Sequence, residues 1–246
     1  HFRTGVTGSG VADGAGRGRW VAMTVLASDT FSGGSSADLG ANWDATRNAA
    51  NSLQPMKLTA GGLGLAQGTN NTQDSSESYN AITWPDDQYS QVTFGDISTG
   101  GLGTGYGPYV RMTPKNEAKF NGYLIDCSSS GFALRRVNDG IFMRLIESTA
   151  TTFANGDTVR LEVRGDSPVR FKMFKNGVEF APGQVDTIPG YHTGGRAGLR
   201  HSSTTQVGTT VGIDSWEGGS LPFTGRSDLS EFPKPKHRAA VLAGQI

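Results

Sequence analysis

Asp214 and Glu217 are the only pair of carboxylates in the sequence that we consider for acid–base chemistry. Two carboxyl groups about 5–5.5 Å apart act as nucleophile and acid/base when a retaining enzyme hydrolyses a glycosidic bond. Both residues belong to the run Gly212-Ile-Asp-Ser-Trp-Glu217, which we expect to be a strand. A divergent glycoside hydrolase or lyase is therefore one hypothesis for the chain.

Other catalytic motifs are missing from the sequence. It has no G-x-S-x-G nucleophile turn and no Gly-Lys pair of a phosphate-binding loop. The glycine-rich run 101–107 fits a hairpin loop better than a dinucleotide-binding turn, because Pro108 follows it. The four histidines are scattered without the spacing of a zinc site: His1, His192, His201 and His237. We therefore expect a chain without catalytic activity.

The charge balance and the single cysteine exclude several classes of protein. Lys and Arg number 22 and Asp and Glu also number 22, so there is no positive surplus to attract nucleic acid. Cys127 is the only cysteine, which rules out an intramolecular disulfide and favours a buried apolar role. The apolar run 20–27 is too short to span a bilayer. We expect neither nucleic acid partners nor a membrane span.

Alternating side chains indicate strands along most of the sequence. In the run 158–164, Val159, Leu161 and Val163 alternate with charged or hydroxyl residues, which is the pattern of a half-buried strand. Asn176-Gly177 predicts a two-residue type I′ turn between two further strands. A short helix over residues 42–53 remains an alternative to loop there, because Gly40 and Pro55 bracket that segment.

Composition divides the chain into three parts. Residues 1–27 comprise a glycine-rich arm and a first strand at 20–26, and residues 28–219 carry the strand-like runs. Residues 220–246 contain three prolines, a basic cluster and an apolar end, which indicates a docking tail. Short strands joined by glycine-rich turns predict an all-β fold, a two-sheet antiparallel jelly-roll sandwich with extended arms at both ends.

Eight runs, in this order, carry a resemblance to a known family: Asp29-Thr-Phe31, Leu39-Gly-Ala-Asn-Trp43, Trp84-Pro-Asp-Asp-Gln-Tyr-Ser-Gln-Val-Thr-Phe94, Gly107-Pro-Tyr-Val-Arg111, Gly156-Asp-Thr-Val-Arg-Leu-Glu-Val163, Phe174-Lys-Asn-Gly-Val178, Arg196-Ala-Gly-Leu199 and Gly212-Ile-Asp-Ser-Trp-Glu217. Together they resemble LamG-like members of the concanavalin A-like lectin/glucanase superfamily over residues 28–219. The resemblance implies two antiparallel sheets with the first and last strands adjacent. It also implies a range of functions from glucan hydrolysis through sugar binding to structural packing, so the fold does not select one.

The resemblance also bears on catalysis and on metal binding. Glucanases of this superfamily carry Glu-x-Asp-x-x-Glu on one strand, and here Gly212 stands where the nucleophile belongs. Some members hold a structural Ca²⁺ near the joined terminal strands, where Asp29 and Asp214 fall in this sequence. Carboxylate oxygens suit that ion, so we expect these two residues as calcium ligands. The alternative is that Asp29 caps a turn and Asp214 is solvated.

Sugar binding requires an aromatic face for the pyranose C–H surface and polar groups around it. Tyr106, Tyr109 and Tyr191 lie on or beside glycine-rich runs, and Arg111 follows two of them closely. We therefore expect these four residues at a ligand site. The alternative is that the tyrosines pack inside the domain.

Three functional hypotheses follow. The first is a non-catalytic structural or adhesive protein of an extracellular assembly, such as a capsid decoration, tail or fibre of a phage virion. Its partners would be other copies or neighbouring subunits bound through the terminal arms, at an extracellular location or the virion surface. The alternative is a lectin-like module that binds glycans, and the second alternative is the hydrolase or lyase of Asp214 and Glu217.

Overall fold

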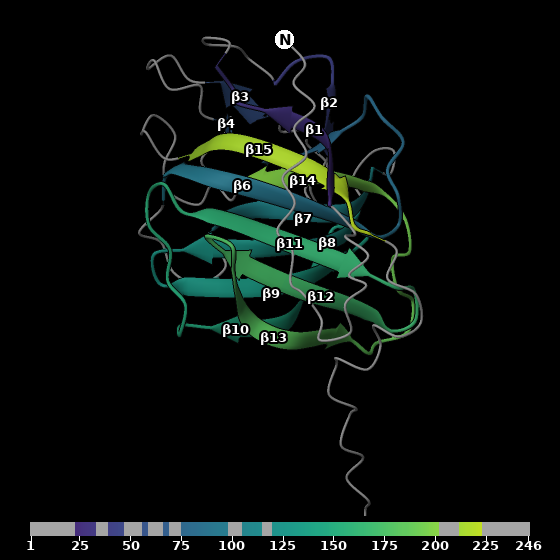
Figure 1. The fold of residues 1–246 in the computed structure, drawn as a ribbon. Helices are drawn as coiled ribbons and strands as arrows, with labels where there is room; N and C mark the ends of the chain where they lie inside the picture. The colour runs from purple at the N-terminus through teal and green to yellow at the C-terminus, as the bar shows by residue number, and fades with distance from the viewer. Residues whose placement is uncertain are drawn as a thin grey trace, which may run out of the picture.

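The computed structural model describes residues 23–32, 39–46, 56–58, 66–68, 75–97, 105–114, 120–201 and 212–222. These residues form two antiparallel β-sheets that lie face to face (Figure 1). The two-sheet sandwich predicted from alternation and implied by the family resemblance is therefore confirmed. Most of the predicted arm and of the predicted tail, residues 1–22 and 223–246, lie outside the described residues.

Eight strands form the first sheet, in the order β13-β12-β11-β6-β15-β4-β3, with β1 also paired to β15. Their bounds are β1 Thr24–Asp29, β3 Met56–Leu58, β4 Ala66–Gly68, β6 Gln88–Asp96, β11 Thr158–Arg164, β12 Val169–Lys175, β13 Val178–Asp186 and β15 Gly212–Ser220. The pairing of β1 with β15 brings the first and last strands together, as the resemblance implied.

Seven strands form the second sheet, in the order β10-β9-β8-β7-β14-β5-β2. Their bounds are β2 Trp43–Thr46, β5 Ser75–Tyr79, β7 Tyr106–Pro114, β8 Phe120–Ser128, β9 Gly131–Asn138, β10 Ile141–Ser148 and β14 Arg196–His201. Strands β7 to β10 follow one another in the chain and pair as neighbours, so the side of this sheet that ends at β10 is a simple meander.

Local patterns in the sequence correspond to these strands. Val159, Leu161 and Val163 of β11 are completely buried, as their alternation predicted. Asn176 and Gly177 both have positive φ, 49° and 79°, which a type I′ turn requires, and Lys175 pairs with Val178 across it. Cys127 on β8 is buried, and burial raises the pKa of its thiol well above the usual range.

The short helix considered for residues 42–53 is wrong at its start. Trp43–Thr46 forms strand β2, which pairs with β5, and residues 47–53 lie outside the described residues. Tertiary packing makes this segment a strand, because the Trp43 indole is buried against Trp216, with ring centroids 4.7 Å apart. Burying that ring outweighs a weak local helix propensity.

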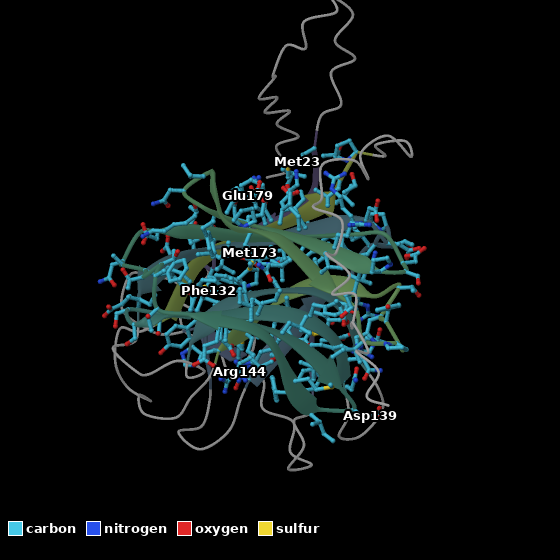
Figure 2. All side chains as sticks on the ribbon, turned by 90° about the horizontal axis from the view of Figure 1, so that it is seen from below. Met23, Phe132, Asp139, Arg144, Met173 and Glu179 are labelled. Atoms are coloured by element: carbon cyan, nitrogen blue, oxygen red, sulfur yellow. The ribbon has the colours of Figure 1, made fainter. Side chains whose placement is uncertain are left out.

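Interdigitating side chains fill the space between the sheets. Met173 and Phe132 lie between them, whereas Glu179 and Arg144 lie on opposite outer sides (Figure 2). Trp216 contacts three other aromatic rings, those of Trp43, Tyr79 and Trp84. Its Nε1–H donates to Ser90 Oγ at 2.9 Å, so the polar edge of the ring is satisfied as well. No helix able to cross a bilayer is present among the described residues.

Trp216→Ala should lower the free energy of unfolding by about 3–5 kcal/mol, because it removes the ring at the centre of this cluster and leaves a cavity. Equilibrium urea denaturation measures the change. Val178→Ala is the control, since Val178 is 71% exposed and its truncation should cost about 0.5 kcal/mol or less. Equal losses for the two variants would contradict a core organised around Trp216.

Candidate functional site

The outer face of the seven-stranded sheet carries a set of charged and hydroxyl side chains in unusual positions. Tyr123, Ile125 and Cys127 of β8 point into the core between the sheets. Their neighbours Leu124 and Asp126 therefore point to the outer face, because successive residues of a strand alternate. We call this surface, built by β5, β14, β7, β8, β9 and β10, the outer face.

Asp126 is the centre of a buried ion cluster on the outer face. Arg135 Nε of β9 lies 2.7 Å from Asp126 Oδ2, and Arg200 Nη1 of β14 donates to Asp126 Oδ1. The side chain of Asp126 is 1% exposed and that of Arg200 is 4% exposed. We call these three residues the Asp126 cluster. Ionic groups this deeply buried hold fixed positions, because each hydrogen bond is stronger at low local dielectric.

A half-buried aromatic ring adjoins the Asp126 cluster. The guanidinium carbon of Arg200 lies 4.7 Å from the centroid of Phe142, which is on β10. Three strands separate β14 from β10 in the sheet, so a flat sheet would hold their backbones about 19 Å apart. That separation exceeds the reach of the two side chains, so the sheet curves and its outer face is concave. Phe142 also contacts Phe120, edge to face, at 5.9 Å.

Exposure increases along the outer face towards β10. The side chain of Arg135 is 15% exposed, that of Glu147 is 22% and that of Arg144 is 59%. Arg144 and Glu147 of β10 form an ion pair at this rim. The outer face therefore runs from a buried ionic anchor to an accessible edge, which is a suitable arrangement for a ligand that enters from β10.

Two hydroxyl groups lie buried on the same face. Among the described residues, neither Tyr109 Oη of β7 nor Ser78 Oγ of β5 has a hydrogen-bond partner. Burial raises the pKa of Tyr109 well above its usual range, and Arg200 and Asp126 both act on it electrostatically. The phenol therefore stays protonated beside the Asp126 cluster. Buried hydroxyls without partners cost free energy, which a polar ligand would recover.

The structure places the tyrosines that the sequence analysis expected at a ligand site in buried or partly buried positions. Tyr106 is 1% exposed in the main core, with its ring 4.2 Å from that of His201, and Tyr109 is 0% exposed. Tyr191 is partly buried against the main core. Neither Tyr106 nor Tyr109 therefore has an exposed ring face: Tyr106 packs in the main core, and Tyr109 packs in a second apolar cluster with Phe120 and Leu124. A ligand role for these residues stays a prediction. Tyr109 remains near the outer face through its hydroxyl.

The buried Arg111 side chain forms hydrogen bonds to two separate loops. Its Nε donates to Asp86 O at 2.9 Å and its Nη1 donates to His192 O at 2.8 Å. Asp87 and Asp166 lie 3.6 and 3.7 Å from its Nη2. Desolvation lowers the pKa of this guanidinium, and the carboxylates oppose that effect. Arg111 has a positive φ of 53° and a side chain with no exposure, so its observed contacts are structural.

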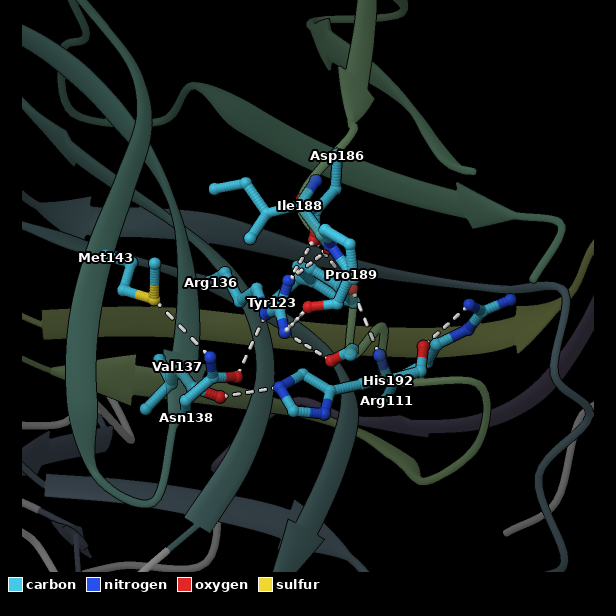
Figure 3. Close-up of polar contacts among 11 residues, drawn as sticks. Arg111, Tyr123, Arg136, Val137, Asn138, Met143, Asp186, Ile188, Pro189 and His192 are labelled. Atoms are coloured by element: carbon cyan, nitrogen blue, oxygen red, sulfur yellow. Dashed lines mark hydrogen bonds and ion pairs between the residues drawn. The ribbon is translucent and has the colours of Figure 1, made fainter. Parts of the chain in front are cut away.

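The loop between β13 and β14 is held by a polar network around Arg136 (Figure 3). Arg136 Nη1 lies 3.1 Å from Asp186 Oδ2 and donates to Ile188 O at 2.8 Å. Tyr123 Oη donates to the same Asp186 oxygen and accepts from the His192 backbone N–H. The ring of His192 in turn bonds to Val137 O at 2.8 Å. The sequence analysis missed this network because its members lie on separate strands.

The expected calcium ligands occupy neighbouring strands without forming a complete site. Asp29 pairs in register with Trp216, two residues beyond Asp214. Both carboxylate oxygens of Asp29 already accept hydrogen bonds, from the Phe31 N–H at 2.8 Å and the Trp43 Nε1–H at 3.0 Å. The described residues contain no group of three His, Cys, Asp or Glu suited to a metal. Calcium takes about six to eight oxygens, so calcium binding stays a prediction.

Comparison with known proteins gives distant structural likenesses. No family model matches the chain, and no curated protein matches it. A carbohydrate-binding module, CBM66 from Bacillus subtilis, has 15% sequence identity over 73% of this chain and 92% of its own, with a TM-score of 0.44. A legume lectin-like domain from Entamoeba histolytica has 14% identity, 73% and 90% coverage and a TM-score of 0.45.

The exoplasmic/lumenal domain of VIP36, in a form bound to Ca²⁺ and Man3GlcNAc, has 16% identity over 78% of this chain and 88% of its own, with a TM-score of 0.44. These values are too low to support an argument about function. The functional argument therefore rests on the outer face of this chain.

Arg136→Met should lower the free energy of unfolding by about 3–5 kcal/mol, because it leaves Asp186 buried without its guanidinium partner. Urea denaturation measures the loss, and hydrogen exchange should quicken at residues 187–195. Arg144→Met is the matched control: the Arg144 side chain is 59% exposed, so the cost should stay below about 1 kcal/mol. A loss for Arg136→Met no larger than the control's would show that the network does not hold the loop.

Proposed function

We propose that this chain is a lectin-like module that binds carbohydrate on the outer face of its seven-stranded sheet. The observation that carries the proposal is the half-buried Phe142 ring beside the Asp126 cluster. An aromatic face accepts the C–H surface of a pyranose, and fixed ionic groups bond its hydroxyls in chosen directions. The outer face offers both within one concave surface.

The arrangement is suited to selective binding because its polar groups are held in place before a ligand arrives. Arg135 and Arg200 are both oriented by Asp126, and Arg200 also lies against Phe142. Groups that are fixed in advance lose little conformational entropy on binding. A sugar hydroxyl accepts a hydrogen bond from a guanidinium, and Arg135, whose side chain is 15% exposed, can donate one.

We further propose that the module is not catalytic. Glu217 lies near the Tyr89 side chain on the eight-stranded sheet and acts on it electrostatically, and Asp214 lies at a bulge in β15. Between them Trp216 points into the core. On the outer face, Asp126 is held by two guanidiniums and Glu147 is paired with Arg144. These placements favour binding over acid–base chemistry.

The hypothesis of a structural protein in an extracellular assembly stays a prediction. It depends mainly on the arm and the tail, of which residues 1–22 and 223–246 lie outside the described residues. A glycan-binding outer face is compatible with an extracellular location and with an adhesive role in a larger particle. The sandwich supports the sugar-binding part of that hypothesis through Phe142 and the Asp126 cluster alone.

Phe142→Ala should weaken binding of any retained polysaccharide by about tenfold, because it removes the ring that stacks on the sugar. A glycan array first identifies a ligand, and affinity electrophoresis then measures the change in affinity. Phe174→Ala is the matched control. Phe174 is also half-buried and lies 4.2 Å from an arginine guanidinium, that of Arg160, but on the outer side of the other sheet.

The control variant should bind like the unmodified chain. If Phe174→Ala weakens binding and Phe142→Ala does not, the binding surface is on the eight-stranded sheet and the proposed site is wrong. If no polysaccharide in a broad panel is retained by the unmodified chain, the proposed function itself is contradicted.

A further inference from the structure

The turn between β12 and β13 presents an asparagine that can react with its own backbone. We infer that Asn176 is a site of spontaneous deamidation in the folded protein, and that the hydrogen bonds of its side chain set the rate. The Gly177 backbone nitrogen gives its proton to a base in the solvent and attacks Cγ of Asn176. The new bond closes a succinimide ring, and Nδ2 takes a proton from the solvent and leaves as ammonia. Water then opens the ring at one of its two carbonyls and yields aspartate or isoaspartate.

The sequence contains three Asn-Gly dipeptides, at residues 121–122, 155–156 and 176–177. Glycine favours the reaction at all three, because it has no Cβ to hinder the approach of its nitrogen. Two of the glycine nitrogens are held by the fold. The Gly156 N–H donates to Phe94 O at 2.7 Å, and Gly122 is buried within β8, where it pairs with Val137. The backbone has to open before either nitrogen can attack.

The nitrogen of Gly177 is in a different situation. Asn176 and Gly177 are both exposed at the tip of the hairpin, and among the described residues no backbone carbonyl accepts from the Gly177 N–H. The strand pairing begins again at Lys175 and Val178, on either side of the turn. Gly177 can therefore move towards Asn176 without separating β12 from β13. Attack at this site needs only a local rearrangement.

Three hydrogen bonds restrain the side chain of Asn176, and we call them the Asn176 clamp. Oδ1 accepts from the Thr158 N–H at 2.8 Å and from Thr158 Oγ1 at 3.3 Å, and Nδ2 donates to Asp157 Oδ1 at 2.7 Å. Burial raises the pKa of Asp157, but hydrogen bonds from Lys175 and Asn176 outweigh it and hold the pKa below its usual range. Asp157 is therefore ionised at neutral pH. The amide has to leave this clamp before its Cγ can meet the Gly177 nitrogen.

Deamidation changes the charges within the clamp. A carboxylate at position 176 keeps an oxygen that can accept from Thr158, but it loses the N–H that donates to Asp157. Two carboxylates then face each other where a hydrogen bond was, and like charges in contact repel. Lys175 Nζ, 2.9 Å from Asp157 Oδ2, offsets only part of this repulsion. We therefore expect the modified turn to detach from the start of β11.

Peptide mapping by mass spectrometry follows the three asparagines in one sample. The full chain is incubated in mildly alkaline buffer, once folded and once unfolded in urea. In the folded chain Asn176 should convert about tenfold faster than Asn155 or Asn121, because a backbone hydrogen bond has to break first at those sites. In urea the three rates should be similar. The inference is overturned if folded Asn155 or Asn121 converts as fast as Asn176, or if folded Asn176 stays intact while the unfolded chain converts.

Variants of the clamp test whether it sets the rate. Asp157→Ala should speed conversion of Asn176 about tenfold, because it removes the charge-assisted bond to Nδ2. Thr158→Val removes only the longer bond to Oδ1 and should have a smaller effect in the same direction. Glu179→Gln is the matched control, since it removes one negative charge from an exposed position in the same hairpin and should leave the rate unchanged. If neither clamp variant exceeds the control, the clamp does not set the rate and that part of the inference is wrong.

Asn176→Asp reproduces the charge of one product. The Asn176 backbone N–H donates to Thr158 O at 3.0 Å, and this bond attaches the turn to β11. Hydrogen exchange of the backbone amide at position 176 should quicken about tenfold in the variant, because repulsion from Asp157 opens that contact. Exchange as slow as in the unmodified chain would show that the modified turn stays attached, which contradicts the expected consequence.

Discussion

Packing of the two sheets around Trp216 imposes a constraint on every strand of the seven-stranded sheet. Each residue that enters the core forces its neighbours to the opposite side, because side chains of a strand alternate. On β8 the buried Tyr123, Ile125 and Cys127 leave Asp126 no other direction than the outer face. The position of the Asp126 cluster therefore follows from the apolar core on the other side of the same strands.

The outer face combines a buried ion cluster with a buried apolar cluster, which consists of Tyr109, Met112, Phe120, Leu124 and Val137 with Phe142 packed against them. Asp126 and Arg200 are almost inaccessible, whereas Arg144 at β10 is mainly exposed. Replacing buried ion pairs by apolar residues is often neutral or stabilising, so stability alone gives weak reason to keep them. A binding role explains the cluster better, because guanidiniums fixed by a shared carboxylate and an adjoining ring form a prepared polar surface.

The sequence predicted those features that depend on near neighbours in the chain. Alternation in β11 and the Asn176-Gly177 turn could be predicted because period and turn chemistry are local. Strand β2 could not be predicted, since Trp43 packs in the core against residues far along the chain.

The Asp126 cluster could not be predicted for the same reason: its three members lie on β8, β9 and β14, and no sequence motif links them. Tyr106 and Tyr109 were expected at a ligand site because they lie on or beside a glycine-rich run, and this run leads into β7, where both rings are buried. The calcium ligands and the terminal arms remain predictions.

Hydrogen–deuterium exchange with and without a bound oligosaccharide tests most directly whether the outer face is the binding surface. Exchange reports on each strand separately, so it locates the ligand without altering any side chain. The account predicts slower exchange in β8, β9 and β10 when the sugar is bound, and unchanged exchange in β11, β12 and β13. Protection confined to β11–β13, with β8–β10 unaffected, would contradict it.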